Sequence, residues 1–419
     1  MRKMIDSGVE WLGAIPQDWD LVQIKSIASC KSEKSSYIGG AYIGLEHIES
    51  GSGKLLADGS QTGIEVDSTV SSFSDTDILF GKLRPYLAKA AKPNFDGQCS
   101  TEILVLNPSS RIQKDFLFWY LLDPAFIDAV NASTYGAKMP RANWNFIGSC
   151  YLPLPPMNMQ TVISSVLNEK FAQVDTLIAN VQAQIEKLKA YKQSVITEVV
   201  TKGLDPTVPM KDSGVEWIGE IPAHWGVTRI KNMFELRNER NDEADLTKVN
   251  LISLYTDLGV VQHSDLTATT GNRAVTAEGY KIVRKNDIVV NIILCWMGAV
   301  GMSQYDGVTS PAYDIYRPLK DTNSEYYHYL FRTNRFNGEC YRYGRGIMMM
   351  RWRTYSTEFR AINIPCPPAE EQKKIVAHLN EKCNKIDQLS AIKQAKIEKL
   401  EQYKRSLIYE YVTGKREVV

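Results

Sequence analysis

The stretch Asp6–Gly13 (DSGVEWLG) returns 206 positions later as Asp212–Gly219 (DSGVEWIG). An Ile-Pro pair and a further tryptophan follow both openings, and later blocks recur at an offset of 212, such as LNEK at 167–170 and 379–382. Such a spacing far exceeds the roughly 20–50 residues of a solenoid repeat. The sequence therefore predicts one domain written twice.

Each copy begins with a globular part of mixed structure. Short apolar runs between glycines, such as Asp77–Phe80 and Asp287–Val290, predict strands, and Asp115–Ala125 predicts a helix. The most apolar run, Ile288–Met297, is too short to cross a bilayer and predicts a buried strand. We therefore expect an α/β (α+β) fold, and these globular middles differ most between the copies.

A long helix is predicted at the end of each copy, because about 43 residues lack proline and glycine, at 158–202 and 369–413. Apolar residues of the first helix alternate in steps of four and three, the spacing of a coiled-coil seam that only Lys192 interrupts. The second helix is less regular, and Lys404 is among its breaks. The expected seam residues are Val174, Ile178, Val181, Ile185, Leu188, Ile386, Ile397 and Leu400.

Connection lengths predict how the helices run. The first helix leads through the short link 203–211 into the second globular part, and the second helix leaves that same part. It buries its apolar stripe most simply by running back along the first, as an antiparallel pair with a globular domain near each end. The expected division is 1–156 and 204–367 for the globular domains, with 157–203 and 368–419 for the helices.

Arginine and aromatic residues mark a candidate DNA face. In the second copy, 331–360 carries seven arginines against two glutamates, and arginine suits both phosphate and guanine. The matching stretch of the first copy is 135–144, and a further cluster follows a predicted strand at 82–86. The candidate contacts are Lys82, Arg84, Tyr86, Lys138, Arg141, Asn143, Arg342, Arg345, Arg351 and Arg353. A solvated charged surface is the alternative, and Trp144 and Trp352 fit a core equally well.

No catalytic, cofactor or metal site is predicted. The GSGK stretch at 51–54 lacks the spacing of a phosphate loop, and the five histidines are isolated. Seven scattered cysteines without a Cys-x-x-Cys pair, and a start without the apolar stretch of a signal peptide, favour a soluble cytoplasmic protein with no membrane contact. The net charge of +1 confines any DNA-binding surface to a local patch.

These features together resemble the specificity subunits of type I restriction–modification systems. The resemblance covers essentially the whole chain and rests on two Trp-Leu/Ile-Gly-x-Ile-Pro openings, two variable middles and Pro-Pro-x-x-x-Gln before each long helix. Pro367–Gln372 with Ile375 matches the family's Pro-Pro-x-x-Glu-Gln-x-x-Ile signature, whereas Met159-Gln160 departs from it in the first copy.

The resemblance implies a non-catalytic subunit that binds double-stranded DNA. Each globular domain would read one half of a bipartite, asymmetric target, and the helices would set the spacer and dock two modification subunits. Restriction subunits would join the full complex, and the partners would bring S-adenosylmethionine, ATP and magnesium. Two other classes remain: a coiled-coil scaffold whose ends bind proteins, and an enzyme with an unrecognised site, such as a methyltransferase fused to its reader.

Overall fold

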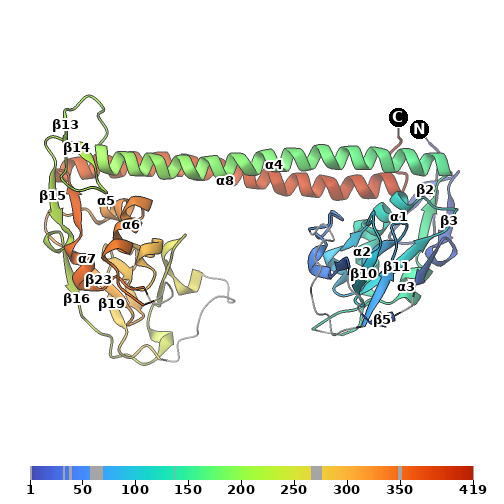
Figure 1. Ribbon diagram of the computed structural model, residues 1–419, viewed down its shortest axis with the longest axis horizontal. Helices are drawn as coiled ribbons and strands as arrows, with labels where there is room; N and C mark the ends of the chain where they lie inside the picture. Colours follow the sequence, from blue (N-terminus) through green and yellow to red (C-terminus); the bar gives the residue numbers. More distant parts are fainter. Residues whose placement is uncertain are drawn as a thin grey trace. The chain divides into compact units, whose positions relative to one another are not determined.

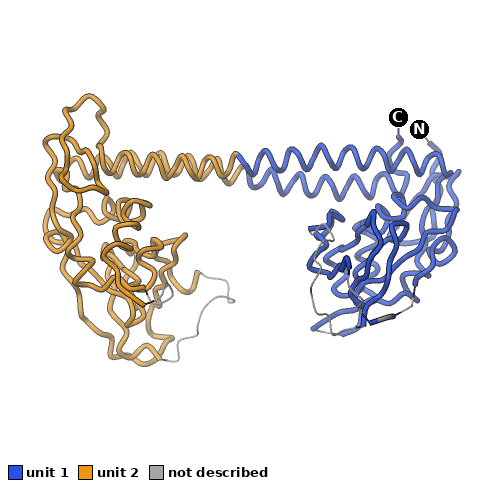
Figure 2. The backbone as a smooth tube through the Cα atoms, viewed as in Figure 1, with its two compact units in different colours: residues 1–183, 393–419 blue, residues 184–392 orange. Residues whose placement is uncertain are grey.

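The computed structural model describes residues 2–31, 34–36, 40–56, 69–136, 138–265, 276–347 and 352–418 (Figure 1). The chain forms two compact units (Figure 2): unit 1 comprises 1–183 and 393–419, and unit 2 comprises 184–392. Each unit contains a globular region and a part of both long helices, α4 (Met157–Lys202) and α8 (Ala369–Val412). The structure confirms the mixed α and β class and the two long helices.

Unit 1 is built mainly from short antiparallel strands around three short helices. Its sheets have the orders β1-β2, β12-β3, β4-β11-β8-β9 and β5-β7-β10-β6, and among the described strands of this unit only β10 and β6 pair in parallel. The elements are β1 Met4–Asp6, β2 Ala14–Pro16, β3 Asp20–Gln23, η1 Ile24–Ser26, β4 Ala28–Lys31, β5 Lys34–Ser36, β6 Tyr42–Ile43, η2 Leu45–His47, β7 Thr69–Phe73, β8 Ile78–Gly81, η3 Pro85–Leu87, β9 Ala90–Ala91, β10 Gly97–Ser100, β11 Ile103–Pro108, α1 Lys114–Leu121, α2 Pro124–Ala132, α3 Trp144–Ser149 and β12 Tyr151–Leu154.

Unit 2 repeats much of this plan, but two two-stranded sheets replace the second four-stranded sheet. Its sheets have the orders β13-β14, β15-β24, β16-β23-β20-β21, β17-β18 and β19-β22. The elements are β13 Met210–Asp212, β14 Glu220–Pro222, β15 Gly226–Arg229, η4 Ile230–Asn232, β16 Phe234–Arg237, η5 Leu246–Lys248, β17 Ile252–Tyr255, β18 Gly259–Gln262, η6 His263–Asp265, β19 Lys281–Val283, β20 Ile288–Asn291, η7 Cys295–Met297, β21 Val300–Met302, β22 Gly307–Thr309, β23 Tyr313–Pro318, α5 Ser324–Phe331, α6 Asn334–Tyr343, α7 Ser356–Ala361 and β24 Asn363–Cys366.

The central sheets of the two units are equivalent. The order β4-β11-β8-β9 corresponds to β16-β23-β20-β21, and β8 and β20 are completely buried inner strands that start 210 positions apart. Their continuous apolar runs form strands because both faces pack against other elements. The loop that follows each of these strands therefore occupies the same place in the two units.

Two sequence predictions are corrected at these elements. The predicted strand over 288–297 ends at Asn291, because its side-chain oxygen accepts hydrogen bonds from the N–H groups of Ile293 and Leu294 and turns the chain. The predicted helix over 115–125 divides into α1 and α2. The division occurs because Asp123 caps α2 and Pro124 occupies its first position.

Both long helices contribute to the core of each unit. The core of unit 1 takes Ile163 and Leu167 from the start of α4, together with Leu407 and Val412 from the end of α8. In unit 2 the roles are exchanged, and the core takes the end of α4 and the start of α8. This exchange is the packing expected of an antiparallel pair in which each helix is anchored at both ends.

Two cross-helix ion pairs, related by the internal repeat, join α4 to α8. Lys404 lies 2.7 Å from Asp175 within unit 1, and Lys192 lies 2.7 Å from Asp387 within unit 2. Both partners differ by 212 positions between the pairs. The lysines that interrupt the apolar pattern are therefore cross-helix contacts.

Along both helices, the expected apolar seam residues lie beside the two ion-pair positions or between them. Of the expected seam residues, Val174, Val181, Ile185 and Ile386 are buried, whereas Ile178, Leu188, Ile397 and Leu400 are half-buried. Among the described residues, no helix is both long and apolar enough to cross a membrane.

Candidate nucleic-acid interface

Two candidate segments of unit 1, distant in the sequence, lie side by side. The Arg84 N–H donates to the Pro140 carbonyl at 2.8 Å, and the Ala142 N–H donates to the Lys82 carbonyl at 2.9 Å. A further bridge joins Leu83 to Arg141. We call the resulting surface loop pair 1 and define it as residues 82–87 and 138–143.

Arg84 has an unusual backbone in loop pair 1. Its φ of 52° and ψ of 63° place it in the left-handed region, which costs a non-glycine residue on the order of 1 kcal/mol. The loop holds this conformation through the bond from Arg84 to Pro140 and a second bond, from the Leu87 N–H to the Arg84 carbonyl. Strain of this kind concentrates at functional positions. The Arg84 side chain is exposed.

The predicted contacts of unit 1 divide into framework and free groups. Arg141 forms a bidentate ion pair with Glu102, with nitrogen–oxygen distances of 3.0–3.2 Å, and this bond raises the pKa of Arg141. The Asn143 side chain caps α3 by accepting from the Phe146 N–H. These two residues hold the loops in place. In the described part of the chain, no carboxylate pairs with the remaining cations, Lys82, Arg84 and Lys138, and Tyr86 is exposed beside them.

Unit 2 contains an equivalent surface. The Thr354 N–H donates to the Ile292 carbonyl at 2.9 Å, which repeats the bond from Ala142 to Lys82, and Arg345 bridges to Arg353. We call this surface loop pair 2 and define it as residues 292–297, 345–347 and 352–354. The equivalence shows that the repeat extends to the main-chain frame of the candidate site.

The arginines of loop pair 2 and its surroundings also divide into two groups. Arg345 pairs with Glu358, and the exposed Arg342 lies 3.6 Å from Glu339 and 3.9 Å from Glu216. Arg353 is exposed, and no carboxylate among the described residues pairs with it. Arg351 lies outside the described residues.

Tryptophan side chains pack against the arginine-rich stretch 331–360 and its counterpart in unit 1. Trp352 stacks on Tyr341 with ring centroids 4.9 Å apart and donates its indole N–H to the Tyr341 carbonyl. Tyr341 in turn meets Trp296 edge to face. In unit 1, Trp144 packs against the core. These ring contacts fix the loops, while Tyr341 stays partly open to solvent.

A buried glutamine connects each long helix to its globular region. Gln160 and Gln372 are each 1 % exposed, and their amide groups donate to the carbonyls of Pro155 and Pro367. Their side-chain oxygens accept from the N–H of Gln113 and Asn323, at the starts of α1 and α5. The Pro-Pro-x-x-x-Gln motif therefore sets the angle at which each helix leaves its globular region.

The residue before this glutamine differs between the units. Glu371 accepts a hydrogen bond from the indole N–H of Trp225 at 2.9 Å, and its carboxylate also lies 2.8 Å from His224. Met159 occupies the corresponding position in unit 1. The indole nitrogen of Trp19, the counterpart of Trp225, is buried and has no hydrogen-bond partner in the part of the chain that the structure describes.

Comparison with known proteins then decides the family. The model of the type I restriction modification DNA specificity domain matches residues 16–187 and again 222–402. The chain belongs to this specificity family. The two matches coincide with the two copies of the repeat, each with its globular region and most of the following helix.

Curated relatives agree with this assignment. The chain is 28% identical over 243 residues to the EcoDI specificity subunit of Escherichia coli, a match that covers 57% of this chain and 49% of that protein. It is 25% identical over 428 residues to the putative MjaX specificity subunit of Methanocaldococcus jannaschii, covering 96% and 95% of the two chains. The chain therefore spans about half the length of the EcoDI specificity subunit that it matches.

Solved structures share the fold. An HsdS subunit from Thermoanaerobacter tengcongensis matches with a TM-score of 0.54 and 17% identity, over 98% of this chain and 100% of that one. A chain from a study of complex assembly in a type I R-M system matches with a TM-score of 0.67 and 17% identity, over 96% and 99%. As a member of the specificity family, the chain is a DNA sequence-recognition subunit of a restriction–modification system.

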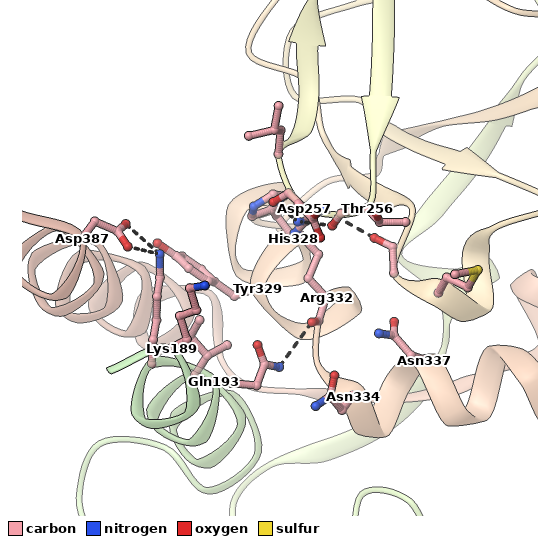
Figure 3. A pocket seen from close by; sticks show the side chains of 15 residues that line it. Lys189, Gln193, Thr256, Asp257, His328, Tyr329, Arg332, Asn334, Asn337 and Asp387 are labelled. Carbon is pink, nitrogen blue, oxygen red and sulfur yellow. Dashed lines mark hydrogen bonds and ion pairs between the residues drawn. The ribbon is translucent and has the colours of Figure 1, made fainter. Parts of the chain in front are cut away.

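One cavity of this specificity subunit was not foreseen from the sequence. A pocket of about 830 Å³ lies within unit 2, between the helix pair and the globular region (Figure 3). Arg332 extends along its wall and donates to four backbone carbonyls, those of Thr256, Asp257, Gly298 and Val300. Arg332 belongs to the arginine-rich stretch predicted to face DNA, but it clamps the β17–β18 turn to Gly298 and to the start of β21.

A neutral histidine lies beside this clamp. Burial and the neighbouring Arg332 lower the pKa of His328 to about 3, and its Nδ1 accepts from the Met302 N–H. The uncharged ring and the clamped arginine make this wall a structural support for loop pair 2, since Gly298 follows η7 directly. Within the described ranges, no three His, Cys, Asp or Glu side chains gather as metal ligands would.

Proposed function

We propose that each globular region, 1–156 and 204–367, is a target-recognition domain that reads one half of a bipartite, asymmetric DNA sequence. The observation that carries this proposal is the equivalence of the two loop pairs. The same main-chain bonds hold them, from Ala142 to Lys82 and from Thr354 to Ile292, whereas their side chains differ. A shared frame with different side chains is the arrangement that two readers of two different half-sites require.

The free cations supply the DNA-binding charge in this proposal. Lys82, Arg84 and Lys138 in unit 1 and Arg353 in unit 2 lack carboxylate partners among the described residues, so binding a phosphate or a guanine breaks no ion pair. Arg141 and Arg345 act mainly as framework, because each is already paired. Arg351 remains a proposed contact on the sequence alone.

The helices 157–203 and 368–419 set the spacer between the half-sites and dock two modification subunits. Each unit carries the same set of exposed side chains beside its cross-helix ion pair. Unit 1 exposes Leu177 and Tyr403, and unit 2 exposes Leu389 and Tyr191, at an offset of 212. Exposed apolar residues that occur twice in equivalent surroundings suit two copies of one partner.

The chain itself performs no chemistry in this proposal. Methyl transfer and DNA cleavage belong to the modification and restriction subunits, which bring S-adenosylmethionine, ATP and magnesium. Methyl transfer by the isolated chain would contradict this part of the proposal.

The test is co-purification with the modification subunit encoded beside it, followed by selection from a randomised duplex pool at moderate salt. Two short motifs at a fixed spacing, with affinity that falls as salt rises, are the expected result. Loss of the complex together with no enriched motif would favour a scaffold that binds proteins through its ends. The double variant Leu177→Ser, Leu389→Ser serves as a docking control, because it should weaken assembly without changing the enriched motif.

A further inference from the structure

The loops after β8 and β20 differ in chemistry although their backbones correspond. Both run from the inner strand into a one-turn 3₁₀ helix, η3 or η7, which begin 210 positions apart. Both are tied to the second half of their loop pair by the repeated main-chain bond. The two loops therefore present equivalent positions to whatever each unit binds.

At these positions unit 1 presents cations and unit 2 presents apolar groups. Lys82 and Arg84 correspond to Ile292 and Leu294 at the same offset of 210, and Leu87 corresponds to Met297. Leu294 is 36 % exposed and Met297 is 50 % exposed. Leu294 thus lies open to solvent at the position where unit 1 carries its strained arginine, and Met297 is exposed at a position that is apolar in both units.

The turn that exposes Leu294 is fixed by specific bonds. Asn291 ends the strand by accepting from the Leu294 N–H, and the Leu294 carbonyl then accepts from the N–H groups of Met297 and Ala299. The segment 352–354 lies alongside through the bond from Thr354 to Ile292, and its exposed Arg353 supplies the positive charge that this loop lacks. Loop pair 2 therefore joins an apolar edge to a cationic edge.

We propose that Leu294 and Met297 read the C5 methyl group of thymine in the half-site bound by unit 2. This inference rests on the proposed function, because it takes DNA as the ligand of loop pair 2. Among the base edges in the major groove, the thymine methyl is the apolar group, whereas guanine, adenine and cytosine present hydrogen-bonding atoms. An apolar loop flanked by arginines matches a thymine next to phosphates, as the cationic loop of unit 1 matches guanine.

The test replaces each thymine of the selected target by uracil, one at a time, which removes only the methyl group. At one or more positions we expect the full chain, in complex with its modification subunit, to bind roughly fourfold more weakly, the value of one buried methyl group. The double variant Leu294→Ala, Met297→Ala should lose this discrimination and should bind the thymine and uracil duplexes equally.

Two controls assign the effect to this loop. Leu319→Ala removes a leucine of the same unit with matched exposure, 37 %, at the opposite end of β23 from Asn291, so it should leave the discrimination unchanged. Arg84→Ala should also leave it unchanged while weakening recognition of the other half-site.

The outcomes separate the two proposals. If a bipartite target is selected but uracil is tolerated at every thymine, or the discrimination survives in the Leu294→Ala, Met297→Ala variant, the methyl-reading inference is overturned and the proposed function stands. A selected target without any thymine in the half-site bound by unit 2, which is the half-site that Arg84→Ala leaves unaffected, would overturn it as well. If no motif is selected, the result contradicts both the proposed function and this inference.

Discussion

Met159→Glu should stabilise unit 1, because it supplies the acceptor that the buried Trp19 indole lacks. In unit 2 the corresponding Glu371 accepts from Trp225 at 2.9 Å. An unpaired buried N–H costs about 1–3 kcal/mol. A glutamate at position 159 would also stabilise the first turn of α4, because the helix dipole favours a negative charge there.

The net gain is smaller than this range. Glu371 keeps 25 % of its side chain exposed, so only part of the hydration of the new carboxylate is lost. Methionine and glutamate lose similar rotamer entropy on burial, and those contributions nearly cancel. We expect a stabilisation of about 1 kcal/mol, which for a unit of this size raises the melting temperature by roughly 2–4 °C.

The assay is urea unfolding followed by tryptophan fluorescence, with hydrogen exchange to place the change around Trp19. Met159→Leu is the control that keeps an apolar side chain. The reciprocal variant Glu371→Met should destabilise unit 2, and Glu371→Gln, which keeps an acceptor oxygen, should do so less. The reasoning is refuted if Met159→Glu is no more stable than Met159→Leu while Glu371→Met and Glu371→Gln behave alike.

Three further predictions concern charged groups. Burial raises the pKa of Asp123 to about 7, above its ordinary value of 3.8, so the stability from its neutral form is present at low pH and is lost as pH rises through 7. Asp123→Asn should therefore stabilise the chain at pH 8 relative to wild type and little at pH 4, as measured by calorimetry at both values. Lys404→Ala should cost about 1–2 kcal/mol and Lys192→Ala less than about 1 kcal/mol, since their side chains are 6 % and 31 % exposed; equal losses in urea titrations would contradict this. Arg84→Ala should reduce the salt dependence of DNA binding by about one phosphate contact, whereas Arg141→Ala should mainly lower the melting temperature. The reverse pattern in salt titrations would show that the ion pair does not mark a framework residue.

Features with a local cause or an internal repeat could be predicted from the sequence. The duplicated openings and the runs free of proline and glycine predicted two equivalent regions and two long helices, because each signal is carried by neighbouring residues. The strand predicted over 288–297 extended too far, because one hydrogen-bonding side chain, Asn291, outweighed the apolar pattern.

The division of the arginines into free and paired groups could not be predicted. Glu102 and Arg141 are far apart in the sequence, and only the fold brings them into a bidentate pair. The same holds for Arg332, whose four backbone acceptors come from two separate parts of the chain, 256–257 and 298–300. Lys404 interrupts an apolar pattern when its own helix is considered alone, and its role appears only beside Asp175 of the other helix.

The main-chain frame of the loop pairs has a consequence for how new specificities arise. The bonds from Ala142 to Lys82 and from Thr354 to Ile292 use only backbone atoms, so exchanging the exposed side chains of Tyr86, Leu294 and Met297 removes neither bond. Positions 86, 294 and 297 can therefore vary at little expense in stability, whereas position 84 is restricted by its left-handed backbone to a narrower set of residues. Mutational tolerance is thus concentrated at three of the positions proposed to read DNA, which would let a target sequence drift while the scaffold stays the same.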